Sequence, residues 1–217
     1  MEIVHIGDSA SVYPPDLKTY LGSSAPETVA ALGNLDLLKQ KTLALFCSVK
    51  CPGNLILETY DLAGRLRHAG VTVIGGFHSP MERECLVQLL RGSQPIIACP
   101  ARSLAGMRLP GEYQEPLKEG RLLVLSPFSE KQSRATAQMA LYRNRFVAAL
   151  AGRVFVAYAE PAGKTEQFCR EIIGWGKPLY TLGSDANANL MALGASTVRP
   201  EDASRLTGDG IGDAKGG

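Results

Sequence analysis

The sequence predicts an α/β fold, a Rossmann-like doubly wound and mostly parallel sheet with helices on both faces. Three observations lead to this prediction. Short apolar runs alternate with amphipathic stretches from residue 43 onward. The apolar runs are continuous, which is typical of strands buried on both faces. Glycines close most segments. Right-handed crossovers between parallel strands then give the doubly wound arrangement.

The first half of the alternation is expected to hold three strands and two helices. The strands are expected at residues 42–47, 71–74 and 95–99, each rich in apolar side chains. The helices are expected at residues 52–69 and 81–90. Pro52 supports the first of these helices, because proline is favoured in the first turn of a helix. The apolar positions of residues 52–69 also recur at helical spacing.

The second half continues the pattern. Strands are expected at residues 122–125, 154–157 and 178–182. Helices are expected at residues 113–118, 133–151 and 165–173. Glycine follows the last two of these helices, as is common at helix ends.

The alternation also divides the chain. Residues 1–41 do not follow it and are expected to form an N-terminal extension that packs on the core. Residues 42–199 are expected to form the Rossmann-like domain. Residues 200–217 are rich in Gly and Asp and are expected to fray as a flexible tail. With 217 residues, the chain is long enough for one α/β domain.

Composition narrows the class of function. The chain has 23 Lys and Arg against 21 Asp and Glu, so any nucleic-acid binding must come from a local patch. No apolar run approaches the length of a membrane span, and the N-terminus lacks a secretory pattern, so no membrane partner is expected. Five scattered cysteines argue against a disulfide framework and favour a cytoplasmic location. No metal site is expected.

Four loops follow predicted strands and are small, polar or glycine-bearing: residues 48–54, 75–80, 126–129 and 159–165. In a parallel sheet these loops meet beyond the carboxyl ends of the strands, where an anion can reach backbone N–H groups. The candidate phosphate-binding residues in them are Ser48, Lys50, Gly75, Gly76, His78, Ser79, Gly163, Lys164 and Thr165. The alternative is that these loops carry Gly and Ser only for turning.

Two nucleotide motifs are absent. Gly163-Lys164-Thr165 resembles the end of a P-loop, but Tyr158 stands where that motif needs its first glycine. The first predicted strand is followed by Gly53 alone, not by a dinucleotide fingerprint. We therefore expect neither an NTPase nor a dinucleotide enzyme, and no resident cofactor. No catalytic residue is assigned, because His78 as a single loop histidine is more typical of a structural hydrogen bond.

Arg143, Asn144 and Arg145 form an unusual group within a predicted helix. Between Lys131 and Arg153 there are five basic residues and no acidic residue. Guanidinium groups bind phosphate in a bidentate manner, which makes these three residues candidates for a DNA or phosphate site. The alternative is a solvated helix face or a pair of ion pairs.

Several segments, in this order, resemble the family of DNA-processing protein A. Residues 13–18 are similar to its "YP-x-x-L" entry segment, and residues 33–38 to its "GN-x-x-LL" segment. Residues 75–82 occupy the place of its "SGLARGID". Residues 143–150 closely resemble its "RNRIIAGLS" stretch. The resemblance covers about residues 4 to 183.

The resemblance implies single-stranded DNA binding, a homodimer and loading of the recombinase RecA during natural transformation, without a catalytic step. Two departures stand out. Cys47-Ser48-Val49 replaces the family's "GSR", and residues 75–82 lack its Arg and Asp. Phe77 or Phe128 would stack on bases in such a complex.

Two other classes stay open. Pro161–Glu166 resembles in part the "PGG-x-GT" segment of the lonely-guy phosphoribohydrolases. A nucleotide phosphate would then bind at the same edge, and a carboxylate such as Glu166 would stabilise a ribosyl cation. The third class is an oligomeric protein with a vestigial site, which the lost family residues favour.

Overall fold

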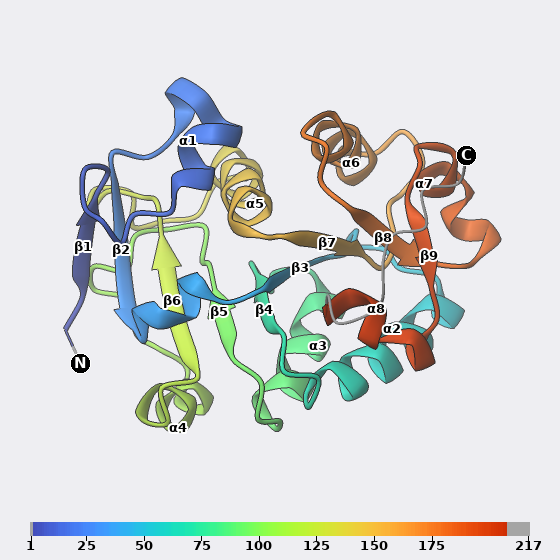
Figure 1. Ribbon diagram of the computed structural model, residues 1–217, viewed down its shortest axis with the longest axis horizontal. Helices are drawn as coiled ribbons and strands as arrows, with labels where there is room; N and C mark the ends of the chain where they lie inside the picture. Colours follow the sequence, from blue (N-terminus) through green and yellow to red (C-terminus); the bar gives the residue numbers. More distant parts are fainter. Residues whose placement is uncertain (1, 208–217) are drawn as a thin grey trace.

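The apolar runs form one sheet, as Figure 1 shows for the computed structural model, which describes residues 2–207. The nine strands are β1 (Val4–Gly7), β2 (Thr28–Gly33), β3 (Thr42–Phe46), β4 (Thr72–Gly75), β5 (Ile96–Ala98), β6 (Leu122–Ser126), β7 (Arg153–Val156), β8 (Leu179–Leu182) and β9 (Ser196–Val198). They lie in the order β1-β2-β6-β5-β4-β3-β7-β8-β9. From β6 to β9 all neighbours are parallel, which confirms the predicted fold class.

The strand order reverses at the centre of the sheet. From β3 the chain steps outward through β4, β5 and β6, and it then returns to place β7 on the other side of β3. Ala44 of β3 pairs with Ile74 of β4 and with Val154 of β7. Ligands of such folds bind beyond the carboxyl ends of the strands near this reversal. We call the junction of β3 and β7 the switch point.

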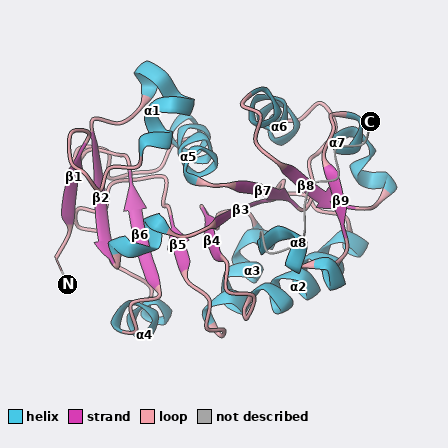
Figure 2. Cartoon of the chain, viewed as in Figure 1, coloured by secondary structure: helices cyan, strands magenta, loops and turns pink. Residues whose placement is uncertain are grey.

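Helices cover both faces of the sheet (Figure 2). They are α1 (Pro15–Leu21), α2 (Gly53–Leu66), α3 (Pro80–Leu90), α4 (Gln114–Lys118), α5 (Ala137–Leu150), α6 (Lys164–Gly174), α7 (Ala188–Ala192) and α8 (Ser204–Thr207). One buried cluster joins the sheet to α2, α3 and α4, and the other joins it to α1, α5 and α6. The strands are buried on both faces, which explains their continuous apolar sequences.

The first 41 residues contribute two strands of their own. Strand β1 pairs antiparallel with β2, and β2 pairs antiparallel with β6. The sheet therefore continues past β6 without a crossover helix, because antiparallel neighbours need no such connection. Strands β1, β2 and β9 were not expected from the sequence. β1 and β9 are short and partly exposed, and β2, although it has six residues, lies in the segment that does not follow the alternation of strands and helices.

The predicted flexible tail is wrong for its first part. A short 3-10 helix spans Pro200–Asp202, and α8 follows it directly. Ala203 and Leu206 are buried in the cluster under α2, which anchors this segment to the core. Positions 208–217 lie outside the described residues. Between residues 2 and 207, no helix is both long and apolar enough to cross a bilayer.

Candidate functional site

Two adjacent glycines end β4 and make room for two side chains. A Cβ on Gly75 would lie 3.0 Å from Cζ of Phe77, whose own φ is +47°. A Cβ on Gly76 would lie 1.8 Å from Nη1 of Arg143. The guanidinium therefore lies against the bare backbone of Gly76, in a space that no other residue type leaves open.

Arg143 is a buried cation that forms no ion pair with any of the described residues. It lies in the second turn of α5 and is 3% exposed. Its Nη1 donates to the Cys99 carbonyl at 2.9 Å, and its Nε donates to Oδ1 of Asn144 at 2.8 Å. Among the described residues, none accepts a hydrogen bond from its Nη2. Burial lowers the pKa of Arg143, and the charge of nearby Glu82 opposes that shift. Arginine still stays protonated at neutral pH.

This guanidinium borders a cavity of about 400 Å³, which we call the Arg143 cavity. The turn after β4, the loop after β5 and the start of α5 surround it. Its ten lining residues include two arginines and one histidine and no acidic residue. They are Gly76, His78, Pro100, Ala101, Arg102, Ala135, Thr136, Ala137, Ala140 and Arg143. A buried charge without a partner is costly, so this cavity favours an anion.

The N-terminus of α5 adds to the same field. Oγ1 of Thr136 accepts a hydrogen bond from the Met139 N–H at 3.2 Å, which fixes the first residue of the helix. This cap explains why the helix begins at Ala137 and not at residue 133. The N–H groups of the first turn and the helix dipole give the cavity a positive end as well as its arginines.

A buried carboxylate accepts hydrogen bonds from the backbone N–H groups beside this cavity. Glu82 in the first turn of α3 accepts from the N–H groups of Cys47 at 3.0 Å, His78 at 2.8 Å and Ser79 at 3.3 Å. Oγ of Ser79 in turn accepts from the Glu82 N–H at 3.3 Å. Two of the predicted phosphate-binding residues, His78 and Ser79, therefore direct their amides inward. Sequence reasoning missed Glu82, although the spacing of a Ser and a Glu three residues later is a helix-start signal.

The switch point brings together a second group of predicted residues. Oγ of Ser48 donates to Oγ1 of Thr165 at 2.9 Å and accepts from the Glu160 N–H at 3.1 Å. Gly163 is the N-cap of α6, and a Cβ there would lie 2.8 Å from the Glu160 carbonyl oxygen. Lys164 starts the same helix. These contacts join the loop after β3 to the loop after β7.

The cations of the switch point are exposed side chains rather than buried groups. Lys50 and Lys164 are exposed, and within the described chain no hydrogen bond or ion pair holds either amine. We call Ser48, Lys50, Gly163, Lys164 and Thr165 the switch-point patch. Its lysines can reach a phosphate by rotation of their side chains, whereas its hydroxyl groups already pair with each other.

The carboxylate of Glu166 also accepts several hydrogen bonds from the protein itself. It accepts from the Ala162 N–H at 2.9 Å, from Nδ2 of Asn189 at 2.8 Å and from Nη2 of Arg170 at 2.6 Å. The hydrogen bond from Asn189 is the main reason that the pKa of Glu166 falls to about 2, and the bonds from Ala162 and Arg170 lower it further. This carboxylate supports its own loop and has little capacity left for a ligand.

The three residues of the Arg-Asn-Arg group do not act together. Arg145 points to α6, where its Nε lies 2.7 Å from Oε1 of Glu171. Asn144 holds the guanidinium of Arg143 and does not line the cavity. Residues two positions apart on a helix face different sides, so only Arg143 reaches the edge of the sheet.

The expected aromatic platforms are not available. Phe77 is 7% exposed and Phe128 is 6% exposed. Phe128 packs edge-on against Tyr142, with ring centroids 5.9 Å apart. Because so little of either ring is exposed, the structure contradicts the prediction that Phe77 or Phe128 stacks on bases. Tyr158 follows β7 and is half-buried, and sequence reasoning missed it.

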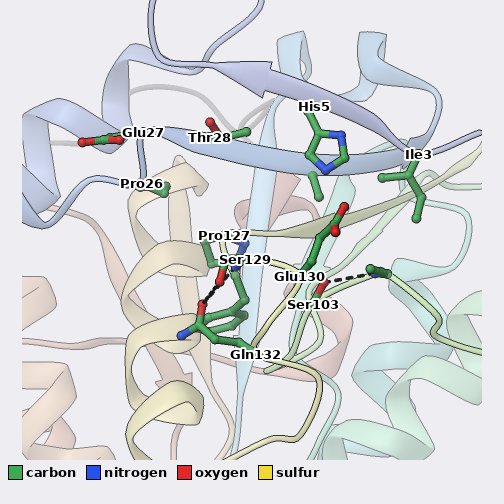
Figure 3. Close-up of a pocket in the computed structure, with 13 residues that line it drawn as sticks. Ile3, His5, Pro26, Glu27, Thr28, Ser103, Pro127, Ser129, Glu130 and Gln132 are labelled. Carbon is green, nitrogen blue, oxygen red and sulfur yellow. Dashed lines mark hydrogen bonds between the residues drawn. The ribbon is translucent and has the colours of Figure 1, made fainter.

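A second, larger cavity of about 610 Å³ lies beside β1 and β2 (Figure 3). The loops after β5 and β6 complete it, and Ser129 and Gln132 hydrogen-bond to each other in its wall. Its charged or titratable residues are His5, Glu27 and Glu130. We call it the β1 cavity. Two carboxylates make it a poor site for phosphate. Within residues 2–207, no group of His, Cys, Asp and Glu could hold a metal ion.

Comparisons with known proteins agree with one another. The family model of DNA recombination-mediator protein A matches residues 3–207. DNA processing protein A from Streptococcus pneumoniae superposes with a TM-score of 0.77 at 20% identity, over 94% of this chain and 73% of that one. DNA processing protein A from Helicobacter pylori, whose structure describes its single-stranded DNA binding mode, gives 0.75 at 19%, over 96% and 97%.

More distant structures share the fold alone. The molybdenum cofactor carrier protein of Chlamydomonas reinhardtii superposes with a TM-score of 0.52 at 11% identity, over 78% of this chain and 96% of that one. No curated protein sequence matches significantly.

Proposed function

Because the chain belongs to the family of DNA recombination-mediator protein A, we propose that it is a DNA-processing protein that binds single-stranded DNA along the carboxyl edge of its parallel sheet. The observation that carries this proposal is Arg143. A guanidinium that is 3% exposed, contacts no carboxylate among the described residues and borders an open cavity is best stabilised by an anionic ligand. The phosphate group is the anion that its geometry suits.

The two cationic regions are close enough to share one strand of DNA. The Arg143 cavity lies at the carboxyl ends of β4 and β5, and the switch-point patch lies at those of β3 and β7. Neighbouring strands are about 4.8 Å apart, so β5 to β7 spans about 14 Å. A few nucleotides cover this length. Lys131 and Arg134, which are exposed in the loop before α5, add charge beside the cavity.

The proposed role is binding without a catalytic step. The two buried carboxylates beside these loops, Glu82 and Glu166, each accept three hydrogen bonds from the protein itself. Neither is left to act as a general base or to stabilise a ribosyl cation, so the geometry gives no support to the phosphoribohydrolase alternative. A nucleotide-binding role remains a second candidate, since a cavity of about 400 Å³ is in the size range of small-ligand sites.

The proposal extends to partners and place. A homodimer, delivery of the bound strand to the recombinase RecA and a cytoplasmic location follow from the family resemblance. The residues of the carboxyl edge support only the DNA contact, and the surface that would meet a second copy or RecA is left to experiment.

Fluorescence anisotropy with a labelled oligo-dT probe bearing hydroxyl ends tests the DNA proposal. We expect affinity to fall as salt rises, because phosphate contacts release counterions. We expect Arg143→Met to weaken binding about tenfold and to reduce the salt slope by about 0.7, which is one phosphate contact. Methionine suits the buried site, since an apolar side chain of similar size replaces a buried charge without leaving a void.

Glu130→Gln, in the β1 cavity, is the matched control and is expected to leave the affinity unchanged or slightly higher. Absence of any binding up to about 100 µM protein at low salt, the weak limit of non-specific binding, would overturn the DNA proposal. Binding of a nucleoside monophosphate by a protein that does not bind the oligo-dT probe would favour the nucleotide candidate.

A further inference from the structure

Three donor groups from two elements, α5 and the loop after β5, border the Arg143 cavity. Arg143 projects from the second turn of α5, Arg102 from the loop after β5, and the first N–H groups of α5 border the same space. Thr136 caps only the Met139 N–H, and within the described residues no acceptor is paired with the N–H groups of Ala137 and Gln138. The guanidinium of Arg102 forms one long contact, from Nε to the Ser103 carbonyl at 3.4 Å.

Three convergent donor groups match the number of oxygens on a terminal phosphate. A phosphomonoester has three non-bridging oxygens, all strong acceptors, while an internal phosphodiester has two. Each of the three donor groups therefore matches a separate oxygen of a monoester. An internal diester would leave one of the three donor groups without a phosphate oxygen.

The charge of the cavity leads to the same ligand. Two arginines give +2, and the N-terminus of α5 adds about +0.5. Glu82, whose charge acts on Arg143, contributes −1. The sum of about +1.5 balances a phosphomonoester, which carries about −1.5 to −2 at pH 7. A phosphodiester carries one negative charge and would leave part of the buried charge uncompensated. His78 is exposed at the rim and does not change this balance when it is neutral.

Resting on the proposed function, we propose that the Arg143 cavity binds the terminal phosphomonoester of a DNA single strand, so that the protein recognises phosphorylated strand ends. Internal phosphates of the same strand then run along the edge of the sheet toward the switch-point patch. The lysines of that patch, being exposed and flexible, accept any phosphate, whereas the buried arginine and the helix start select the end.

The test compares three oligo-dT probes of equal length by competition anisotropy: one with a 5′-phosphate, one with a 3′-phosphate and one with hydroxyl ends. We expect one phosphorylated end to bind about tenfold more tightly than the hydroxyl probe, as charge-assisted hydrogen bonds to the extra charge require. Arg143→Met and Arg102→Gln are expected to remove this ratio. Arg102 lies in a loop, so its variant keeps the test valid if Arg143→Met folds poorly.

Lys164→Gln is the matched control, because it removes a charge outside the cavity. It is expected to weaken all three probes equally and to preserve the ratio. A preference for the 5′-phosphate or for the 3′-phosphate identifies the source of the monoester. Equal binding of all three probes would overturn the inference while leaving the DNA proposal intact, and an end preference that survives both arginine variants would overturn it too. No binding of any probe would instead reject the DNA proposal.

Discussion

The Arg143 cavity and the switch-point patch lie on the same edge of one sheet, yet they differ in what their polar groups contact. At the switch point, Ser48 pairs with Thr165 and with the Glu160 amide, so the polar groups satisfy each other. Next to it, Arg143 is buried with one side of its guanidinium unpaired. The topology selects the edge on which a ligand binds. The unpaired buried charge selects the position along that edge.

The two regions also share one structural feature. In each, a glutamate in the first turn of a helix accepts the amides of the loop that precedes it: Glu82 for the loop after β4 and Glu166 for the loop after β7. This arrangement stabilises the loops and occupies N–H groups that would otherwise meet a phosphate. Side-chain cations must then supply most of the binding, together with the free N–H groups at the start of α5 in the first region, and only that region has a cation that is fixed in place.

The substitution Gly76→Ala is the strongest test of whether the fixed guanidinium of Arg143 binds DNA. The added Cβ would meet Nη1 of Arg143 at 1.8 Å, so the guanidinium must leave its position. We expect oligo-dT affinity to fall about as much as in Arg143→Met, and the free energy of unfolding to drop by about 1 to 3 kcal/mol from overpacking. Anisotropy and chemical denaturation measure the two effects.

Gly64→Ala is the control, because nothing lies within 4 Å of a Cβ at that position in α2. It is expected to keep both affinity and stability, with a small gain from helix propensity. Full DNA affinity in Gly76→Ala, together with a normal melt, would show that the fixed guanidinium is not what binds DNA.

A double variant of the switch-point patch, Lys50→Ala with Lys164→Ala, tests the other side of the comparison. Both amines are exposed, so their loss removes charge without disturbing the core. We expect affinity to fall about threefold to fivefold and the salt slope to decrease by about 1.4, as for two phosphates of a single strand. A salt titration of anisotropy gives both numbers.

If the double lysine variant loses more affinity than Arg143→Met, the main contact lies at the switch point and the order of the two regions is reversed. Lys118→Ala with Lys39→Ala, two exposed lysines that pair with acids elsewhere, controls for net charge.

Most of the parallel sheet could be predicted, because strands buried on both faces leave continuous apolar runs in the sequence. Strands β1 and β2 could not, since they lie at or near the sheet edge and β1 has exposed residues such as Val4. Residues 200–217 were expected to fray because that segment is rich in Gly and Asp, and residues 200–207 of it hold two short helices in the structure. Two apolar side chains, Ala203 and Leu206, anchor them through contacts that composition does not reveal.

The sequence predicts which edge of the sheet holds the site, but not which side chains pair with each other there. Helical spacing places Arg143 and Arg145 on different faces, yet only the fold shows that Glu171 pairs with Arg145. Likewise, Gly76 could be recognised as a turn residue, but its role in admitting Arg143 depends on a contact between segments 67 positions apart in sequence. Such long-range pairings depend on the packing of the whole fold, and local sequence patterns do not predict them.

The smallest expected effect concerns Glu166, which supports the switch-point loop and contacts no proposed ligand. Its pKa is about 2 in the folded protein against an ordinary 4.5, mainly because Asn189 donates to the charged form. A lowered pKa means that the carboxylate stabilises the fold above about pH 4.5 and loses that contribution as the pH falls toward 2. We expect Glu166→Gln to melt at a lower temperature than the wild type at pH 7, with the difference shrinking as the pH falls through this window. The DNA affinity of Glu166→Gln at pH 7 should change less than in either cationic variant.

Glu160→Gln, exposed on the same loop, is the control and should melt like the wild type at every pH. A melting difference that stays constant from pH 7 to 2 would show that the carboxylate's charge is not what holds the loop.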